Sequence, residues 1–530
     1  MLELTIDGRP VTVPEGSTVL EAARAVGIHI PTLCHLAGTK EHRPSCLACV
    51  VRIGDDPRVV PACSTRVAAG MAVHSETPDV LVLRKAALEM LFSDHLGDCV
   101  SICQRVCPAR LPIPALIRRV ADGQLPAAAA LALDASPFPA TLGHVCRAPC
   151  QQGCRRRQHD GAVAIQSIER AVGASNLAAA EPHQPDRQPS SGQRVAIVGA
   201  GAAGLSAAFF LLRAGHACTV FDDQAAPGGA LRRDHPESQL PRAVLEGEIA
   251  LIQRLGLELR LQTRIGRDLS LADLRPQFDA VILAVGDVQK TDASALGVDT
   301  SPRSIRIQAG TFMTSTPGVF ACGSAIRSGY DPARSAGDGA AVARIVDDFL
   351  AGRPVQAPPR LFTSTIPRLT APEQAEITLG SVAALRGRAL TGVAAEAAGR
   401  CWQCDCRAAD DCRLRRYGER LGVDTVAFSG GHRRRFQFIR QPAGVLFEPG
   451  KCISCGICVE LAAQAKEPLG LTFIGRGFDV KVAVPLGGSL ADGLQHVADE
   501  CVRHCPTGAL AYEEAERTRR VRTGAHACDR

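Results

Sequence analysis

The chain has 530 residues, which suggests roughly three to five domains, and its net charge of +6 points to no nucleic-acid partner. The apolar fraction of 46 % suffices for globular cores, yet no apolar run is long enough to span a bilayer. The chain begins as a strand and not as a signal peptide, so a cytoplasmic location is expected. Most of the 22 cysteines fall into tight groups, which in such a chain favours metal centres over disulfides.

Residues 1–98 start with an expected hairpin, Leu2–Ile6 and Arg9–Val13, followed by a helix at Thr18–Val26. A C-x2-C pair with one cysteine on each side then suits a plant-type [2Fe–2S] cluster, with zinc as the alternative. The motifs I-P-T-L-C, V-P-A-C and His95-x3-Cys99 resemble the N-terminal domain of the complex I large iron–sulfur subunit, formate dehydrogenases and iron hydrogenases. That resemblance implies a β-grasp fold, and the expected ligands are Cys34, Cys46, Cys49 and Cys63.

Residues 99–173 carry two more cysteine groups around a helical stretch at Ile113–Ala132. They resemble the helical domain of glutamate synthase small subunits and dihydropyrimidine dehydrogenase, which holds two [4Fe–4S] clusters. One implied ligand set is Cys107, Cys146, Cys150 and Cys154. For the other cluster only Cys99 and Cys103 match, with His95 or Glu169 as substitutes for missing cysteines; free thiols packed as small hydrophobes are the alternative.

Residues 174–193 are a linker rich in Pro, Ser and Gln, and a dinucleotide-binding domain is expected at 194–352. A β-branched strand at Val195–Val198 leads into G-x-G-x-x-G, a helix at Leu205–Arg213, and a second strand that ends in an acid. The glycines permit a tight turn and close backbone approach to a pyrophosphate, and the helix N-terminus stabilises the phosphates. The residues concerned are Gly199, Gly201, Gly204 and Asp222.

Later motifs in this domain resemble the flavin domain of the glutamate synthase small subunit, which implies that the first fingerprint binds FAD. The resemblance adds Gly229, Gly286, Gly323, Ser324 and Asp338 to the cofactor site, although Ser324 replaces the usual acid. In that family a second Rossmann unit for NAD(P)H lies between the segments that match Gly286 and Pro317. Here only about thirty residues separate them, barely one βαβ unit, so no nicotinamide site is recognisable.

A connector is expected at 353–395 and a Cys-rich segment at 396–440, whose four cysteines fall within twelve residues. Their spacing, C-x2-C-x-C-x5-C, suits either a [4Fe–4S] cluster or zinc. These candidate ligands are Cys401, Cys404, Cys406 and Cys412.

Residues 441–512 resemble a bacterial-type ferredoxin domain, because C-x2-C-x2-C is followed later by Cys-Pro-Thr-Gly-Ala-Leu. In such domains the last Cys-Pro cysteine reaches back to the first cluster, which leaves Cys501 over and predicts one [4Fe–4S] cluster. Residues 513–530 form a charged tail. The expected ligands are Cys452, Cys455, Cys458 and Cys505.

The whole is a multidomain α+β and α/β chain that resembles a mosaic of redox modules, and no catalytic acid–base group stands out. The expected function is an electron-transfer flavo-iron–sulfur subunit with FAD, one [2Fe–2S] and two or more [4Fe–4S] clusters. Its partners would be a formate dehydrogenase, a hydrogenase or an NAD(P)H-binding subunit. The alternatives are a self-contained NAD(P)H-dependent oxidoreductase of the glutamate synthase small-subunit type and a cluster-based redox sensor or scaffold.

Overall fold

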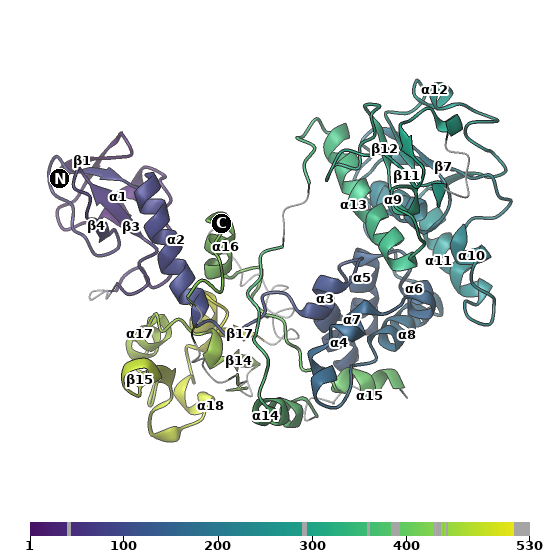
Figure 1. Ribbon diagram of the computed structural model, residues 1–530. Coiled ribbons are helices and arrows are strands. Elements are labelled where there is room, and N and C mark those ends of the chain that lie inside the picture. The colour runs from purple at the N-terminus through teal and green to yellow at the C-terminus, as the bar shows by residue number, and fades with distance from the viewer. Residues whose placement is uncertain are drawn as a thin grey trace. The chain divides into compact units, whose positions relative to one another are not determined.

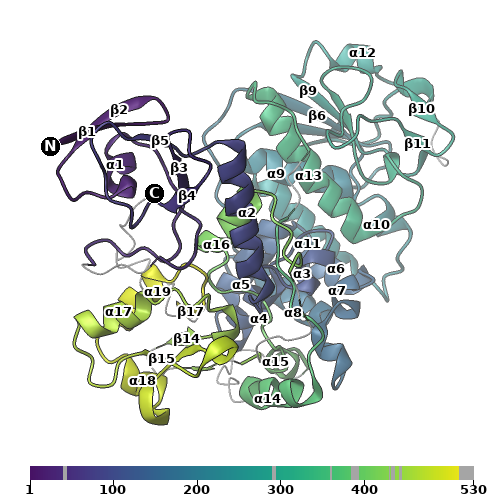
Figure 2. The same cartoon turned by 60° about the vertical axis from the view of Figure 1, so that its left-hand side comes forward.

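The computed structural model describes residues 1–39, 44–288, 294–357, 361–382, 393–428, 430, 436–437, 439–440 and 444–512. The chain divides into two compact units, each built from separate stretches (Figures 1 and 2). Unit 1 comprises Met1–Ser101, Leu361–Gly380 and Cys404–Arg530, and unit 2 comprises Ile102–Arg360 and Ser381–Gln403. The expected charged tail, 513–530, lies outside the described residues.

The N-terminal part of unit 1 is a five-stranded mixed sheet in the order β2-β1-β5-β3-β4. The predicted hairpin is confirmed: β1 (Leu2–Ile6) and β2 (Arg9–Val13) are antiparallel, and Asp7-Gly8 turns between them with positive φ angles. Helix α1 (Val19–Ala25) packs its Leu20 into the core and is closed by a capping box of Thr18 and Glu21. The remaining strands are β3 (Val50–Ile53), β4 (Val59–Pro61) and β5 (Ala72–His74).

Helix α2 (Pro78–Ser93) follows this sheet and buries one stripe of side chains at helical spacing: Val80, Arg84, Leu88 and Phe92. The C-terminal stretch of unit 1 adds a three-stranded sheet, β13-β14-β17, and a separate hairpin, β15-β16. Its elements are α16 (Arg413–Arg420), β13 (Ile439–Arg440), β14 (Val445–Phe447), α17 (Ile457–Gln464), β15 (Thr472–Ile474), β16 (Lys481–Ala483), α18 (Leu490–Gly493), α19 (Ala498–His504) and β17 (Leu510–Tyr512). Helix α14 (Ala371–Val382) comes from the connector.

Unit 2 begins with a helical domain in which α6 and α8 cross at two glycines. A Cβ at Gly143 would lie 2.5 Å from the Arg170 Cα, and one at Gly173 would lie 2.3 Å from the Ala140 nitrogen. Only glycine therefore permits this close approach. The helices are α3 (Ile102–Val106), α4 (Ile113–Ala121), α5 (Leu125–Ala135), α6 (Pro139–Val145), α7 (Pro149–Gln152), α8 (Ile165–Leu177) and, from the second stretch, α15 (Val393–Gly399).

The rest of unit 2 is a Rossmann-like layer built on a wholly parallel sheet in the order β12-β9-β6-β7-β8. The predicted strand–turn–helix–strand run is confirmed as β6 (Arg194–Val198), α9 (Ala202–Arg213) and β7 (Ala217–Phe221). Helices α9 and α13 (Pro332–Leu350) pack closely together, because Gly339 lets α13 approach the Ala203 carbonyl. The other elements are α10 (Ala230–Arg233), α11 (Arg242–Arg254), β8 (Glu258–Arg260), α12 (Leu271–Leu274), β9 (Ala280–Leu283) and β12 (Val319–Ala321).

Between β9 and β12 the described residues form only a small hairpin, β10 (Thr300–Ser301) with β11 (Ser304–Ile305), and a short 3₁₀ turn. No second βαβ unit occurs in the described part of this connection. Among the described residues, no helix is both long and apolar enough to cross a membrane.

Candidate functional site

Four buried cysteines of unit 1 converge beside the N-terminal sheet. The thiols of Cys46 and Cys63 donate hydrogen bonds to Cys34, which lowers the pKa of Cys34. A further hydrogen bond joins the thiols of Cys49 and Cys63, with 3.3 Å between the sulfurs. All four residues predicted for the [2Fe–2S] site are thus linked into one group, and the thiolate that each would present is a normal cluster ligand.

Arg84 of α2 is a buried cation next to this group that the sequence analysis did not single out. Its side chain is 2 % exposed, and its guanidinium donates two hydrogen bonds to the Val50 carbonyl, at 2.8 and 3.1 Å. Because Val50 follows Cys49, Arg84 fixes the backbone at a predicted ligand, and its charge contributes to lowering the pKa of Cys49. The sequence did contain a sign of this buried position, because Arg84 interrupts an otherwise apolar stripe of residues at i, i+4 spacing.

A second group in unit 1 joins Cys99 to Cys406 and Cys412, which the sequence analysis had placed in different sites. Burial raises the pKa of Cys412, and the nearby thiols of Cys406 and Cys99 raise it further. Cys412 also caps α16, where its sulfur accepts a hydrogen bond from the Arg415 N–H at 3.3 Å. His95, one of the proposed substitutes, is buried as well.

Lys451 is a fully buried cation beside this second group. Its ammonium pairs with Glu448 at 2.6 Å, and the two side chains are 1 % and 4 % exposed. The thiol of Cys406 is close enough to help raise the pKa of Lys451. The stem of Lys451 occupies the space beside Gly97, where a Cβ would lie 2.7 Å from the lysine Cε.

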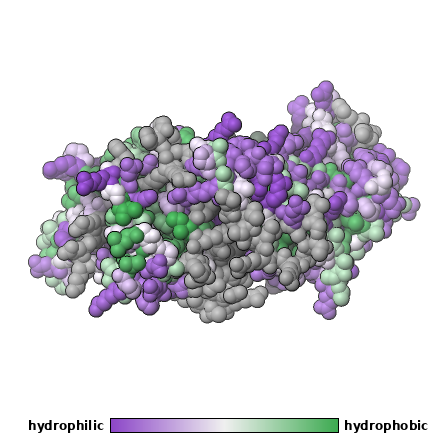
Figure 3. Space-filling model, turned by 90° about the horizontal axis from the view of Figure 1, so that it is seen from below, coloured by the Kyte–Doolittle hydropathy of each residue, from purple (hydrophilic) through white to green (hydrophobic). Residues whose placement is uncertain are grey.

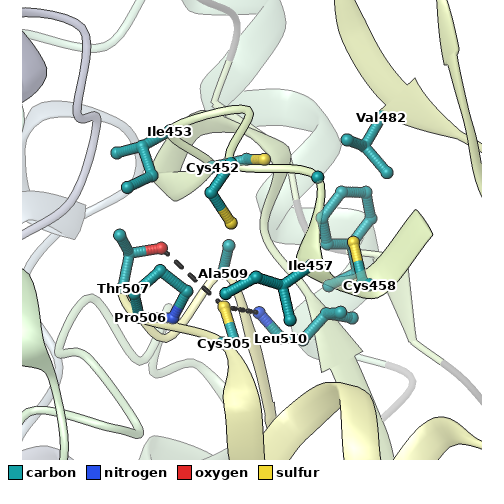
Figure 4. A pocket seen from close by; sticks show the side chains of 13 residues that line it. Cys452, Ile453, Ile457, Cys458, Val482, Cys505, Pro506, Thr507, Ala509 and Leu510 are labelled. Carbon is teal, nitrogen blue, oxygen red and sulfur yellow. Dashed lines mark hydrogen bonds between the residues drawn. The ribbon is translucent and has the colours of Figure 1, made fainter. Parts of the chain in front are cut away.

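The C-terminal cysteines line one apolar pocket, which Figure 4 shows with the sulfurs of Cys452 and Cys505 turned into it. Backbone N–H groups donate to these sulfurs, from Ser454 to Cys452 at 3.3 Å and from Leu510 to Cys505 at 3.5 Å. Such hydrogen bonds stabilise a thiolate. Cys455 and Cys458 also line the pocket, whereas Cys501 is not among the lining residues.

In unit 2, the Glu169 carboxyl lies near enough to three of the predicted ligands to contribute to raising their pKa values. Burial raises the pKa of Cys146 to about 11, and the charges of Glu169 and Cys107 contribute. Burial also raises the pKa of Cys150, and the charges of Cys107 and Glu169 raise it further. Glu169 itself has its pKa raised to about 8, by burial and by the Glu248 carboxylate. The structure therefore groups Glu169 with Cys107, Cys146 and Cys150.

Three further cysteines of unit 2 pack against the core of the helical domain: Cys103, Cys401 and Cys154, the last of which was predicted as a ligand beside Cys107, Cys146 and Cys150. Cys404 is assigned to unit 1. The Cys-rich run is therefore divided, since Cys401 packs in unit 2 while Cys412 belongs to a core of unit 1. Within the described residues, no three His, Cys, Asp or Glu side chains are placed to hold a single metal ion.

The G-x-G-x-x-G turn opens onto a cavity of about 530 Å³ at the carboxyl ends of the parallel strands, within the usual range for a cofactor. Gly199 has a φ of +111°, and its Cβ would lie 2.3 Å from the Ala284 carbonyl oxygen. A Cβ at Gly204 would lie 1.9 Å from the Gly199 oxygen, so neither position accepts another residue. The predicted residues that line the cavity are Gly199, Gly201, Asp222, Gly229, Gly286 and Ser324.

Asp222 lies at the end of β7 and already accepts hydrogen bonds from the N–H groups of Ala200 and Gln224, at 2.6 and 2.9 Å. Burial raises its pKa. Three other predicted residues are not among the cavity's lining residues. Gly204 and Gly323 lie in the packing beneath it, and Asp338 pairs with Arg327 at 2.8 Å, where burial raises the aspartate pKa to about 6.

Three domain models match successive parts of the chain. Residues 1–78 match a 2Fe–2S iron–sulfur cluster binding domain, residues 96–180 match dihydropyrimidine dehydrogenase domain II with its 4Fe–4S cluster, and residues 197–246 match an NAD(P)-binding Rossmann-like domain. These matches confirm the predicted resemblances for the first three domains. The C-terminal ferredoxin-like assignment stays a prediction.

Curated relatives match about a third of the chain. The NADPH-Fe(3+) oxidoreductase subunit beta of Geobacter sulfurreducens is 36 % identical over 188 residues, 35 % of this chain and 28 % of that one. The NADP(+)-dependent formate dehydrogenase subunit beta of Moorella thermoacetica is 36 % identical over 206 residues, 35 % and 29 % of the two chains. The glutamate synthase [NADPH] small chain of Bacillus subtilis is 36 % identical over 197 residues, 37 % and 39 %.

The chain thus spans less than half the length of these relatives. It joins a 2Fe–2S domain, a helical 4Fe–4S domain and a Rossmann-like dinucleotide domain in one polypeptide.

Proposed function

We propose that the chain is an electron-transfer subunit of a multisubunit oxidoreductase, with FAD in the Rossmann-like cavity and iron–sulfur clusters at the cysteine groups. Clusters exchange single electrons, and FAD converts between one-electron and two-electron reactions. Two of the relatives are named as beta subunits of redox enzymes, which supports a partner-dependent role. The partner would be a dehydrogenase, a hydrogenase or a nicotinamide-binding subunit.

One contact within unit 2 carries this proposal. A Cβ at Gly337 of α13 would lie 2.3 Å from the carbonyl oxygen of Pro108, so helix and loop touch through backbone alone. Pro108 follows Cys107 of the cysteine group, and Ser335, two residues before Gly337, lines the dinucleotide cavity. The two cofactor sites are therefore joined by a few residues in direct contact, as electron transfer between them requires.

In unit 1, an apolar core brings members of several cysteine groups together. Cys34 and Cys46 of the [2Fe–2S] group pack in one cluster of buried residues with Cys412, and Cys455 lies against that cluster. Phe92 of α2 fills the same core. Members of three separate cysteine groups therefore share one water-excluding environment, which is how a protein keeps successive redox centres near one another.

Exposed apolar side chains near the C-terminal pocket offer a contact for a partner. Phe473, Ile474 and Leu486 are 43, 36 and 97 % exposed, and Figure 3 shows hydrophobic side chains gathered on one part of the face seen there. The Phe473 ring lies 3.5 Å from the Cβ position of Gly456, which follows Cys455 and directly precedes helix α17 with its Cys458. Exposed apolar surface of this kind is common where proteins associate.

The test is cofactor content after anaerobic reconstitution. The [2Fe–2S] group, the unit 2 group with Glu169 and the C-terminal group together require at least about ten irons per chain, beside one FAD. Iron, sulfide and flavin are measured on the same preparation, with metal analysis for zinc. A saturated preparation that holds only zinc, or that holds no flavin, would refute the proposed function.

A further inference from the structure

We infer that Cys401 completes a further [4Fe–4S] site in unit 2 together with Cys103 and Cys154, an inference that rests on the proposed function. The helical domain lacks the extra cysteines that a second cluster would need near its own beginning. The structure supplies one of them from a segment almost three hundred positions later in the sequence, because Cys401 packs against the same hydrophobic core as Cys103 and Cys154.

Cys103 and Cys154 are brought together by a glycine. Cys103 lies in α3, and that helix rests on Gly153, whose Cβ would lie 3.0 Å from Ile102 and 3.2 Å from Val106. Since Gly153 directly precedes Cys154, the two cysteines belong to elements in direct contact. Cys154 is half-buried, as is Cys103.

Both neighbours of Cys401 contact residues of the turn that follows Cys154. The Arg400 side chain pairs with Asp160 at 3.3 Å and donates to the Asp160 carbonyl at 2.8 Å. The buried guanidinium of Arg156 in turn donates to the Arg400 carbonyl. On the other side, the rings of Trp402 and His159 lie 5.9 Å apart. The chain at Cys401 is therefore fastened to the turn that follows Cys154.

Helix α15 secures this arrangement by burying alanines against the helical domain. Ala394, Ala397 and Ala398 pack in the same core as the helices of that domain, and α15 contacts both α4 and α8. The sulfur of Cys401 accepts a hydrogen bond from the Gln403 N–H at 3.4 Å, which favours the thiolate needed for iron.

The experiment measures iron loss in single and paired variants of the full reconstituted chain. Cys103→Ser and Cys401→Ser should each lose about four irons, and the pair should also lose only about four, because both residues serve one cluster. Cys401→Ser with Cys452→Ser should lose about eight, because Cys452 belongs to the C-terminal group and serves a different cluster. Cys218→Ser is the control, since Cys218 is buried in the Rossmann core outside every cysteine group.

The single tryptophan gives an independent local readout, since Trp402 follows Cys401 and is 5 % exposed. Loading iron and sulfide into the apoprotein should quench its fluorescence, and Cys103→Ser should weaken that quenching despite its distance in sequence. The inference is overturned if Cys401→Ser keeps all its iron, or if the Cys103 and Cys401 pair loses more than one cluster. Either result can occur while the wild type retains its ten irons and FAD, so the proposed function would survive it.

Discussion

Replacing Lys451 by methionine should destabilise unit 1 strongly, because it leaves the Glu448 carboxylate buried without its partner. The pair is nearly inaccessible, at 1 % and 4 % exposure, and its atoms are 2.6 Å apart. Removing one member of such a pair costs about 3–5 kcal/mol, against a total stability of about 5–15 kcal/mol for a typical domain. Lys451→Met should therefore remove about a fifth or more of the stability of unit 1.

The same physics predicts a rescue. Exchanging both members for apolar residues of similar size is often neutral, because no charge is then left without a partner. Lys451→Met combined with Glu448→Met should regain most of the lost stability. Lys481→Met, at an exposed position of strand β16, should leave the stability unchanged. Urea unfolding followed by circular dichroism and by the visible absorbance of the clusters measures each variant. A Lys451→Met protein that unfolds at the wild-type urea concentration, or a double variant as unstable as the single one, would refute the reasoning.

Three further predictions follow from the sites. Cys505→Ser should remove one [4Fe–4S] signal from the EPR spectrum, while Cys501→Ser should leave that signal unchanged. Of these two cysteines, Cys505 lines the C-terminal pocket and Cys501 does not. The opposite pattern would show that the ligand set is wrong. The FAD-loaded chain should not be reduced within seconds by NADH or NADPH in a stopped-flow experiment, and rapid bleaching of the flavin would favour the self-contained oxidoreductase. Gly337→Ala should force α13 away from Pro108 and slow the reduction of flavin by the clusters, whereas Gly247→Ala, which meets only a flexible leucine side chain, should leave that rate unchanged.

Local patterns in the sequence predicted the elements whose physics is local. The hairpin at Asp7-Gly8 and the run from β6 to β7 follow from turn residues, β-branched strands and glycine spacing, and the structure confirms them. The four N-terminal cysteines were predicted as one group for the same reason, since they lie close together in the sequence, between Cys34 and Cys63.

The grouping of the other cysteines could not be predicted, because it depends on contacts between segments far apart in the chain. Spacing alone joined Cys401 to Cys412, whereas packing divides them between two cores. Likewise Cys99 joins Cys406 and Cys412, although hundreds of residues of unit 2 lie between them. The burial of Lys451 could not be predicted either, because it depends on contacts with both Gly97 and Glu448.

The discontinuity of unit 1 has a consequence for how the protein is made. Its first stretch ends at Ser101 and its last begins at Cys404, so the ribosome must synthesise all of unit 2 in between. At about 5–20 residues per second, Cys99 waits about 15–60 seconds before Cys406 exists. Iron bound at Cys99 during that time would have an incomplete ligand set. On the proposed function, a cluster that uses Cys99 would therefore be delivered only after Cys406 has been synthesised.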